Sequence, residues 1–251
     1  MAEALLRVEH VSKHFGGLLA VNDASFVAEK GGITAVIGPN GAGKTTLFSI
    51  ISGFQRPSAG RVIYEDADIT FHAPHKLARL GIARTFQIVQ PFAGLTVREN
   101  IAVGAHLSCR SRRGALDVAD EVARAVDLHP QVDRLAATLT VAGRKRLELA
   151  RALALAPRVL LLDEVLAGLN PSEVRDMIPV IRSVADRGVT IVMIEHVMQA
   201  VMQLAERIYV LSEGRIIAAG TPNEIGGDAR VVEAYLGRGA ARRMTDRAPR
   251  D

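Results

Sequence analysis

A glycine-rich loop that ends in a lysine and two threonines constrains this 251-residue chain more than any other feature. Its members are Gly38, Pro39, Asn40, Gly41, Ala42, Gly43, Lys44, Thr45 and Thr46. The loop fits the phosphate-binding pattern Gly-x-x-x-x-Gly-Lys-Thr. A short β-branched run at residues 33–37 precedes it, and residues 47–51 follow it with apolar side chains at helical spacing. The sequence therefore predicts a strand, a phosphate-binding loop and a helix in succession.

The residue types of this loop suit a phosphate ligand held with a metal ion. Glycines let backbone N–H groups wrap around phosphate oxygens, and the N-terminus of the following helix adds its positive end to the site. We expect Lys44 to reach the β- and γ-phosphates and the Thr45 hydroxyl to ligate Mg²⁺.

A second apolar run ends abruptly in two carboxylates. Residues 159–162 read Val-Leu-Leu-Leu, and Asp163 and Glu164 follow directly. In phosphate-loop ATPases such a strand is expected beside the strand that carries the loop. Asp163 would then hold Mg²⁺ through water, and Glu164 would polarise an attacking water. Two acids after an apolar run are by themselves a weak indication of these roles. The phosphate-binding loop upstream strengthens the prediction.

The order of the remaining elements predicts an α/β fold. Residues 1–30 are typical of strands separated by a turn at residues 15–17 and predict an N-terminal antiparallel β region. Residues 94–155 have helical periodicity and predict an inserted helical subdomain. Beyond them, strands are expected at 158–162, 189–194 and 208–211, and helices at 172–186 and 197–205. This alternation predicts a mostly parallel core sheet covered by helices.

Charge and hydropathy narrow the class of protein. The chain has 31 Lys and Arg against 27 Asp and Glu, a net charge of +4 that by itself suggests an anionic partner. Residues 238–251 hold five arginines against two aspartates and so carry +3 of it. We therefore expect one domain at residues 1–237, a disordered tail at 238–251 and no nucleic-acid partner. No apolar run approaches the roughly 18 residues of a membrane span, and the N-terminus does not resemble a secretory signal.

Four segments outside the loop and the acidic pair narrow the choice among ATPases. They are Ala83-Arg84-Thr85-Phe86-Gln87, residues 139–153, Ala167-Gly168-Leu169-Asn170 and Ile194-Glu195-His196. With these, the sequence resembles the nucleotide-binding subunits of ABC transporters, in order and spacing, from about residue 5 to residue 237. The Ala83 to Gln87 segment, the Glu195-His196 pair and residues 220–222 and 234–237 are most similar to the LivG-type ATPases of high-affinity branched-chain amino-acid importers.

The resemblance implies roles for individual residues. Phe15 is similar to the aromatic residue that stacks on the adenine of ATP. Gln87 resembles the glutamine that senses Mg²⁺ and the attacking water. His196 resembles the histidine that contacts the γ-phosphate and steadies the catalytic glutamate, here Glu164.

The segment Leu139 to Gly143 departs from the family signature Leu-Ser-Gly-Gly-Gln. Thr140 keeps a hydroxyl for the γ-phosphate of ATP on the opposing subunit, and Val141 takes the place of the first glycine. Ala142 replaces the second glycine, so its Cβ is expected to restrict close approach of the backbone, and Gly143 stands in place of glutamine. Downstream, Asn170 stands where aspartate is usual.

The resemblance also implies an assembly. Each ATP, with Mg²⁺, would lie between one subunit's loop and the partner's residues 139–143, in a head-to-tail homodimer or a heterodimer with a second ABC ATPase. Membrane permease subunits would dock near residues 87–99, with a periplasmic binding protein as a further component. The subunit would be peripheral, on the cytoplasmic face of a bacterial inner membrane. Branched-chain or other hydrophobic amino acids are the expected cargo.

Alternative functions differ in cargo or in class. Another cargo, including lipopolysaccharide for export, would leave the nucleotide site unchanged. A soluble ABC ATPase acting on nucleic acid or ribosomes would usually carry a second cassette, coiled coils or zinc modules. A phosphate-loop kinase would not need residues 139–146 or His196.

Overall fold

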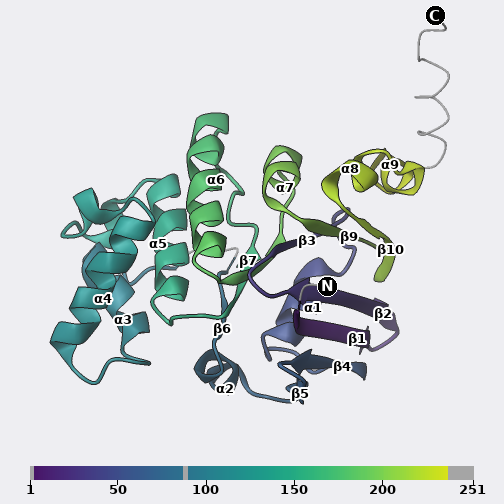
Figure 1. The fold of residues 1–251 in the computed structure, drawn as a ribbon, viewed down its shortest axis with the longest axis horizontal. Coiled ribbons are helices and arrows are strands. Elements are labelled where there is room, and N and C mark those ends of the chain that lie inside the picture. The colour runs from purple at the N-terminus through teal and green to yellow at the C-terminus, as the bar shows by residue number, and fades with distance from the viewer. Residues whose placement is uncertain (1–2, 87–89, 237–251) are drawn as a thin grey trace, which may run out of the picture.

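The computed structural model of the chain describes residues 3–86 and 90–236 and contains two sheets (Figure 1). The smaller sheet is antiparallel, with strand order β2-β1-β4-β5. Its strands are β1 (Ala4–Phe15), β2 (Leu18–Glu29), β4 (Ala59–Tyr64) and β5 (Ala67–Asp68). Alternate residues of β1 and β2 are buried for much of their length, as expected when one face of a sheet packs on a core. The expected N-terminal antiparallel region is therefore confirmed.

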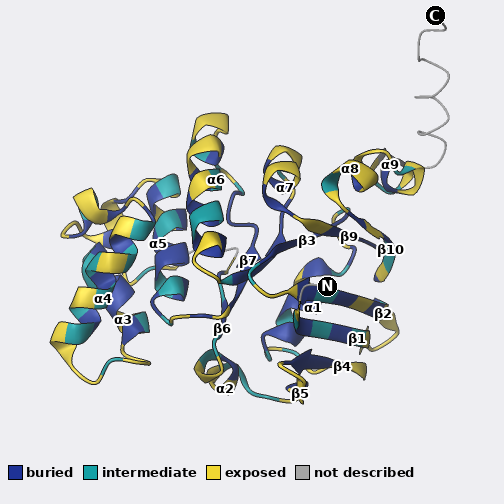
Figure 2. Cartoon of the chain, in the orientation of Figure 1, coloured by how far each residue is buried: buried dark blue, intermediate teal, exposed yellow. Residues whose placement is uncertain are grey.

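The larger sheet has the strand order β10-β9-β3-β8-β7-β6. Its strands are β3 (Ile33–Ile37), β6 (Ile82–Arg84), β7 (Val159–Asp163), β8 (Thr190–Ile194), β9 (Arg207–Ser212) and β10 (Arg215–Gly220). All neighbours pair in parallel except β9 and β10. Every residue of β3, β7 and β8 is buried, which explains why these strands read as continuous apolar runs (Figure 2).

One sequence expectation about this sheet is wrong. Strand β7, which ends in the acidic pair, does not lie beside β3, because β8 lies between them: Ile33 pairs with Ile191, and Thr190 pairs with Val159. Neighbouring parallel strands are joined by long crossovers, so their order depends on how the connecting segments pack and not on proximity in the chain. The carboxyl ends of β3 and β7 still meet at one edge of the sheet.

Helices cover both faces of the larger sheet. Ile33, Ala35 and Ile37 of β3 belong to one apolar cluster with residues of α6 (Pro171–Asp186) and α7 (Met198–Leu204). Val36, on the opposite face, belongs to a second cluster with residues of α1 (Lys44–Ile51) and of the antiparallel sheet. The phosphate loop therefore leaves β3 in the middle of a packed sandwich.

A group of helices lies between β6 and β7 in the chain and forms one end of the molecule in Figure 1. It comprises α3 (Val97–Ala105), α4 (Arg112–Ala125), the short 3₁₀ turns η1 (His129–Gln131) and η2 (Ala136–Thr138), and α5 (Val141–Leu153). Three further helices are α2 (Pro74–Arg79), α8 (Pro222–Gly226) and α9 (Ala229–Leu236). Within residues 3–86 and 90–236, no helix combines the length and apolar character needed to cross a bilayer. The expected tail at 238–251 lies outside the described residues.

Candidate functional site

The glycine-rich loop leaves the carboxyl end of β3 in a conformation that requires glycine at two positions. Gly38 has φ 152° and Gly43 has φ 102°. A Cβ at Gly38 would lie 1.9 Å from the carbonyl oxygen of Leu211, and one at Gly43 would lie 2.3 Å from that of Ala20. Neither contact is possible for a larger residue, so the loop keeps this path only with glycine.

The loop leads into a helix end suited to an anion. Helix α1 begins at Lys44, its N-cap Gly43 offers no side-chain acceptor, and its first turn holds no acidic residue. Its first backbone N–H groups are therefore not capped by a side chain, and they carry the positive end of the helix dipole. The Lys44 side chain folds back over the loop, where Nζ donates to the carbonyls of Gly38 at 2.7 Å and Pro39 at 2.9 Å. Burial lowers the pKa of Lys44, while Glu164 and Asp163 oppose that shift.

Several of the predicted site residues line one hollow of about 580 Å³. Its lining includes loop residues 40–46, the carboxyl end of β1 at Phe15, and Glu164. The Phe15 side chain is 43% exposed, and Lys13 Nζ lies 4.9 Å from the centre of its ring. A planar base could therefore stack on this ring while its phosphates lie in the loop.

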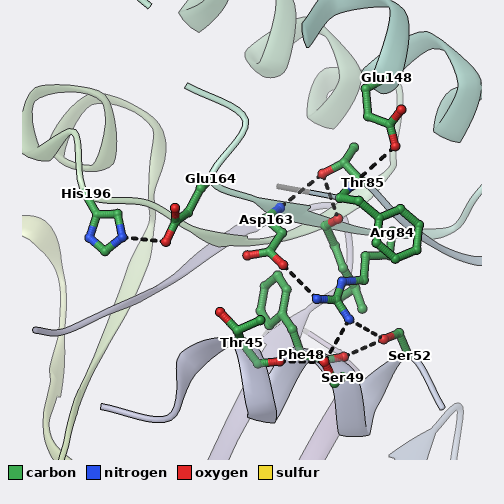
Figure 3. Close-up of polar contacts among 12 residues, drawn as sticks. Thr45, Phe48, Ser49, Ser52, Arg84, Thr85, Glu148, Asp163, Glu164 and His196 are labelled. Carbon is green, nitrogen blue, oxygen red and sulfur yellow. Dashed lines mark hydrogen bonds and ion pairs between the residues drawn. The ribbon is translucent and has the colours of Figure 1, made fainter. Parts of the chain in front are cut away.

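Asp163, the last residue of β7, presents a carboxylate with one free oxygen. Its Oδ2 accepts from Arg84 Nη2 at 2.7 Å, and its backbone N–H donates to Thr85 Oγ1 at 3.0 Å (Figure 3). Oδ1 is buried and has no hydrogen-bond partner within the described part of the chain. Asp163 and Thr45 line the same hollow, of about 750 Å³. A buried, unpartnered carboxylate oxygen near a hydroxyl fits a hard divalent cation such as Mg²⁺.

Glu164 occupies a strained turn immediately after β7. Its φ is +49°, a left-handed conformation that is uncommon outside glycine. Its Oε1 lies 2.5 Å from Nε2 of His196, which follows β8 (Figure 3). The two residues are 32 positions apart in the chain, and the pairing of β7 with β8 brings them together. The structure thus places the expected base beside the expected histidine, and their chemical roles stay predictions.

The segment Thr140 to Gly143 forms the start of α5 and does not line the hollow around the chain's own loop. Thr140 is the N-cap, and its Oγ1 accepts from the Gly143 N–H at 3.1 Å. Val141 is 55% exposed and Ala142 half-buried. A Cβ at Gly143 would lie 3.3 Å from the Cβ of Leu139, so glutamine at this position would require a small shift.

Asn170 retains the local function of an aspartate at its position. It caps α6, and its Oδ1 accepts from the N–H groups of Ser172 at 2.9 Å and Glu173 at 3.0 Å. The capping acceptor is therefore preserved without a negative charge. Gln87, the remaining predicted site residue, lies outside the described residues.

Three charged residues at the site were missed by sequence reasoning: Arg84, Lys145 and Glu195. Arg84 ends β6 and contacts Asp163, whereas Lys145 and Glu195 contact the backbone around Glu164. A signal was available for Lys145, which shares one face of α5 with the buried residues Leu149 and Ala152. A lysine on an apolar face needs a specific partner.

Comparison with known proteins gives the family. The sequence model described as "ABC transporter" matches residues 21–167, more than half of the chain. The chain belongs to the ABC transporter ATP-binding family. A second model, "Branched-chain amino acid ATP-binding cassette transporter", matches residues 215–241. The expectation of an ABC ATPase cassette is thereby confirmed, and the chain is a nucleotide-binding ATPase subunit that energises transport.

Curated relatives match this chain along nearly its whole length and along nearly all of their own. BraF of Pseudomonas aeruginosa, a high-affinity branched-chain amino acid transport ATP-binding protein, is 38% identical over 94% of this chain and 99% of the relative. LivG of Escherichia coli K12 is 37% identical with the same coverage. Among solved structures, a nucleotide-free ATP-binding cassette of an ABC transporter matches with a TM-score of 0.85 and 32% identity. A cassette of an ABC transporter solved in its ADP conformation matches with a TM-score of 0.85 and 33% identity, and both matches cover 94% of this chain and 100% of the solved chain.

Proposed function

We propose that this subunit binds ATP with Mg²⁺ and hydrolyses it to energise import of branched-chain or other hydrophobic amino acids. The observation that carries the hydrolytic part is the pair formed by Glu164 and His196 beside the phosphate loop, with Oε1 and Nε2 2.5 Å apart. Glu164 also lines the hollow that contains the loop, so a water bound against the terminal phosphate would lie within its reach.

The proposed division of labour follows the geometry. Backbone N–H groups of the loop and of the first turn of α1 bind the phosphate oxygens, and Lys44 turns its ammonium from the loop carbonyls toward the β- and γ-phosphates. Thr45 and Asp163, with Gln87, would hold Mg²⁺, which neutralises charge on the phosphates. Glu164 takes a proton from the attacking water. His196 holds the Glu164 carboxylate in place and contacts the γ-phosphate.

A second subunit would complete each site. The segment 140–143 does not line the hollow around the chain's own loop, and the exposed N-terminus of α5 is suited to an anion from outside the chain. Thr140 Oγ1 accepts a hydrogen bond from Gly143, which leaves its own proton to donate to a γ-phosphate held by the partner. The partner is a second copy of this chain or a related ABC ATPase.

The membrane part of the assembly is proposed from the surface next to that site. The outer lining of the hollow of about 750 Å³ includes Gln90 and two exposed apolar residues, Phe86, 43% exposed, and Val103, 47% exposed. Permease subunits would dock on the surface near residues 87–99, at the outer rim of this hollow, with a periplasmic binding protein delivering cargo to them. The subunit would then be peripheral, on the cytoplasmic face of a bacterial inner membrane. The amino-acid cargo is supported by the named functions of BraF and LivG and by the match at residues 215–241.

The test uses the transporter reconstituted in proteoliposomes with its permease and binding protein. Glu164→Gln should keep ATP binding and lower ATP turnover and radiolabelled leucine uptake at least about a hundredfold, the low end for loss of a general base. Glu121→Gln, on the exposed face of α4, is the matched control and should behave as wild type. Near-normal turnover in Glu164→Gln would refute the assigned base. Hydrolysis by the wild type without uptake of leucine or of any other hydrophobic amino acid would refute the cargo alone.

A further inference from the structure

Two buried charged residues hold the backbone of the turn that carries Glu164. We propose that Lys145 and Glu195 are positioning residues for hydrolysis, and that Lys145 ties the position of Glu164 to helix α5. This proposal rests on the proposed role of Glu164 as the base. Neither residue lines the hollow around the loop, so both would act through the turn and not on ATP.

The turn needs external support because its backbone is strained. Glu164 has φ +49°, and such conformations cost free energy for residues with a Cβ unless the surroundings enforce them. On one side, the Glu164 N–H donates to the carbonyl of Ile194 at 2.9 Å. That bond continues the pairing of β7 with β8 and fixes only one end of the turn.

Lys145 holds the other side of the same residue. Its Nζ donates to the carbonyl oxygen of Glu164 at 3.1 Å, across 19 positions of sequence. The residue is 6% exposed, and burial lowers the pKa of its ammonium, while Glu195, Glu164 and Glu148 oppose that shift. Burial of a lysine ammonium costs considerable desolvation energy, so a hydrogen bond such as that to the Glu164 carbonyl is needed to offset the cost.

Glu195 supports the turn two residues further on. Its Oε1 accepts from the backbone N–H of Leu166 at 2.9 Å, and the residue is 1% exposed. Glu195 directly precedes His196, the residue that contacts the Glu164 carboxylate. The two residues after β8 therefore hold the turn at two points. Glu195 contacts its backbone at Leu166, and His196 contacts the Glu164 side chain.

Lys145 links the turn at Glu164 to helix α5, whose N-terminus carries the proposed contact with the partner's ATP. Helix α5 begins with the segment 140–143 proposed to contact the partner's ATP, and Lys145 lies in the next turn of the same helix. A helix transmits displacement as a stiff element, so a shift of its N-terminus moves the ammonium that holds Glu164. The contact made in one ATP site would thus set the geometry of the base in the other.

The first experiment compares variants in the assembled transporter. Lys145→Met should lower kcat for ATP at least tenfold with KM and ATP affinity within twofold, and Lys145→Arg, which keeps a donor, should restore at least a third of the wild-type rate. Lys76→Met, an exposed lysine on α2, is the matched control. Glu195→Gln keeps an acceptor for the Leu166 N–H and should stay near wild type, whereas Glu195→Leu should lose rate as Lys145→Met does. Unchanged kcat in Lys145→Met, or equal losses in Lys145→Arg, would overturn the proposal.

The second experiment asks which of the two ATP sites is affected. In mixed complexes where this chain carries Lys44→Ala, the remaining hydrolysis uses the partner's loop and this chain's segment 140–143. Adding Lys145→Met to that chain should leave the remaining rate within twofold, because its own Glu164 is already idle. A large further loss would place the effect in the segment 140–143 and refute positioning of Glu164. If Glu164→Gln itself retained turnover, the proposed function would fail before this question arose.

Discussion

Arg84 is expected to be essential to the stability of the site because it neutralises a buried carboxylate. The Arg84 and Asp163 side chains are 8% and 2% exposed, and Nη2 lies 2.7 Å from Oδ2. Arg84 Nη1 also donates to the hydroxyls of Ser49 at 3.2 Å and Ser52 at 3.0 Å (Figure 3). Arg84→Met removes the cation and leaves Asp163 with neither carboxylate oxygen partnered among the described residues.

Breaking one side of a buried ion pair costs about 3–5 kcal/mol, because the remaining charge is desolvated and uncompensated. That is a large share of the roughly 5–15 kcal/mol that stabilises a typical domain, so urea unfolding followed by circular dichroism should resolve it easily. Arg61→Met is the matched control. Its contact with Glu9 at 2.7 Å is solvent-exposed, and its loss should hardly move the midpoint.

Two further measurements separate charge from packing. Adding Asp163→Asn to Arg84→Met removes the uncompensated charge and should recover most of the lost stability. Excess Mg²⁺ should stabilise Arg84→Met more than the wild type, because the carboxylate that would bind it has lost its other cation. A single-variant loss below about 1 kcal/mol, in the range of exposed pairs, would refute the reasoning.

Three other predictions concern the loop, the signature segment and pH. Lys44→Ala should abolish measurable ATP binding in a fluorescent-nucleotide titration, and unchanged affinity would exclude the phosphate-loop assignment. Ala142→Gly should leave the ATP affinity of the monomer alone and strengthen ATP-dependent dimerisation in analytical ultracentrifugation; a weaker dimer would show that the native Cβ is accommodated. Burial raises the pKa of Glu195 from its ordinary value of 4.5 to about 7. Its ionisation should therefore lower the free energy of unfolding as pH rises from about 4.5 to 7. Urea midpoints at pH 5 and pH 8 should differ less in Glu195→Gln, and an equal difference would contradict the assignment.

Much of the nucleotide site could be predicted from the sequence because its parts are local. The loop at residues 38–46 follows its strand and precedes its helix without interruption, and Gly38 and Gly43 serve conformations that only glycine adopts freely. Asp163 and Glu164 follow a buried strand directly. Thr140 and Asn170 cap helices through residues two or three positions away. In short-range patterns of this kind, residues close together in the chain determine the geometry.

The sequence by itself determined which residues bear the chemistry, and the tertiary structure decided what holds them in place. Arg84 meets Asp163 across 79 positions, and Glu195 meets Leu166 across 29. These contacts depend on β7 lying between β6 and β8, an order that the apolar strands do not encode in their own residues. The contact of Lys145 with the Glu164 carbonyl likewise depends on α5 packing against the end of β7. These charged side chains hold the site in place because they are buried, and burial is a property of the packed molecule.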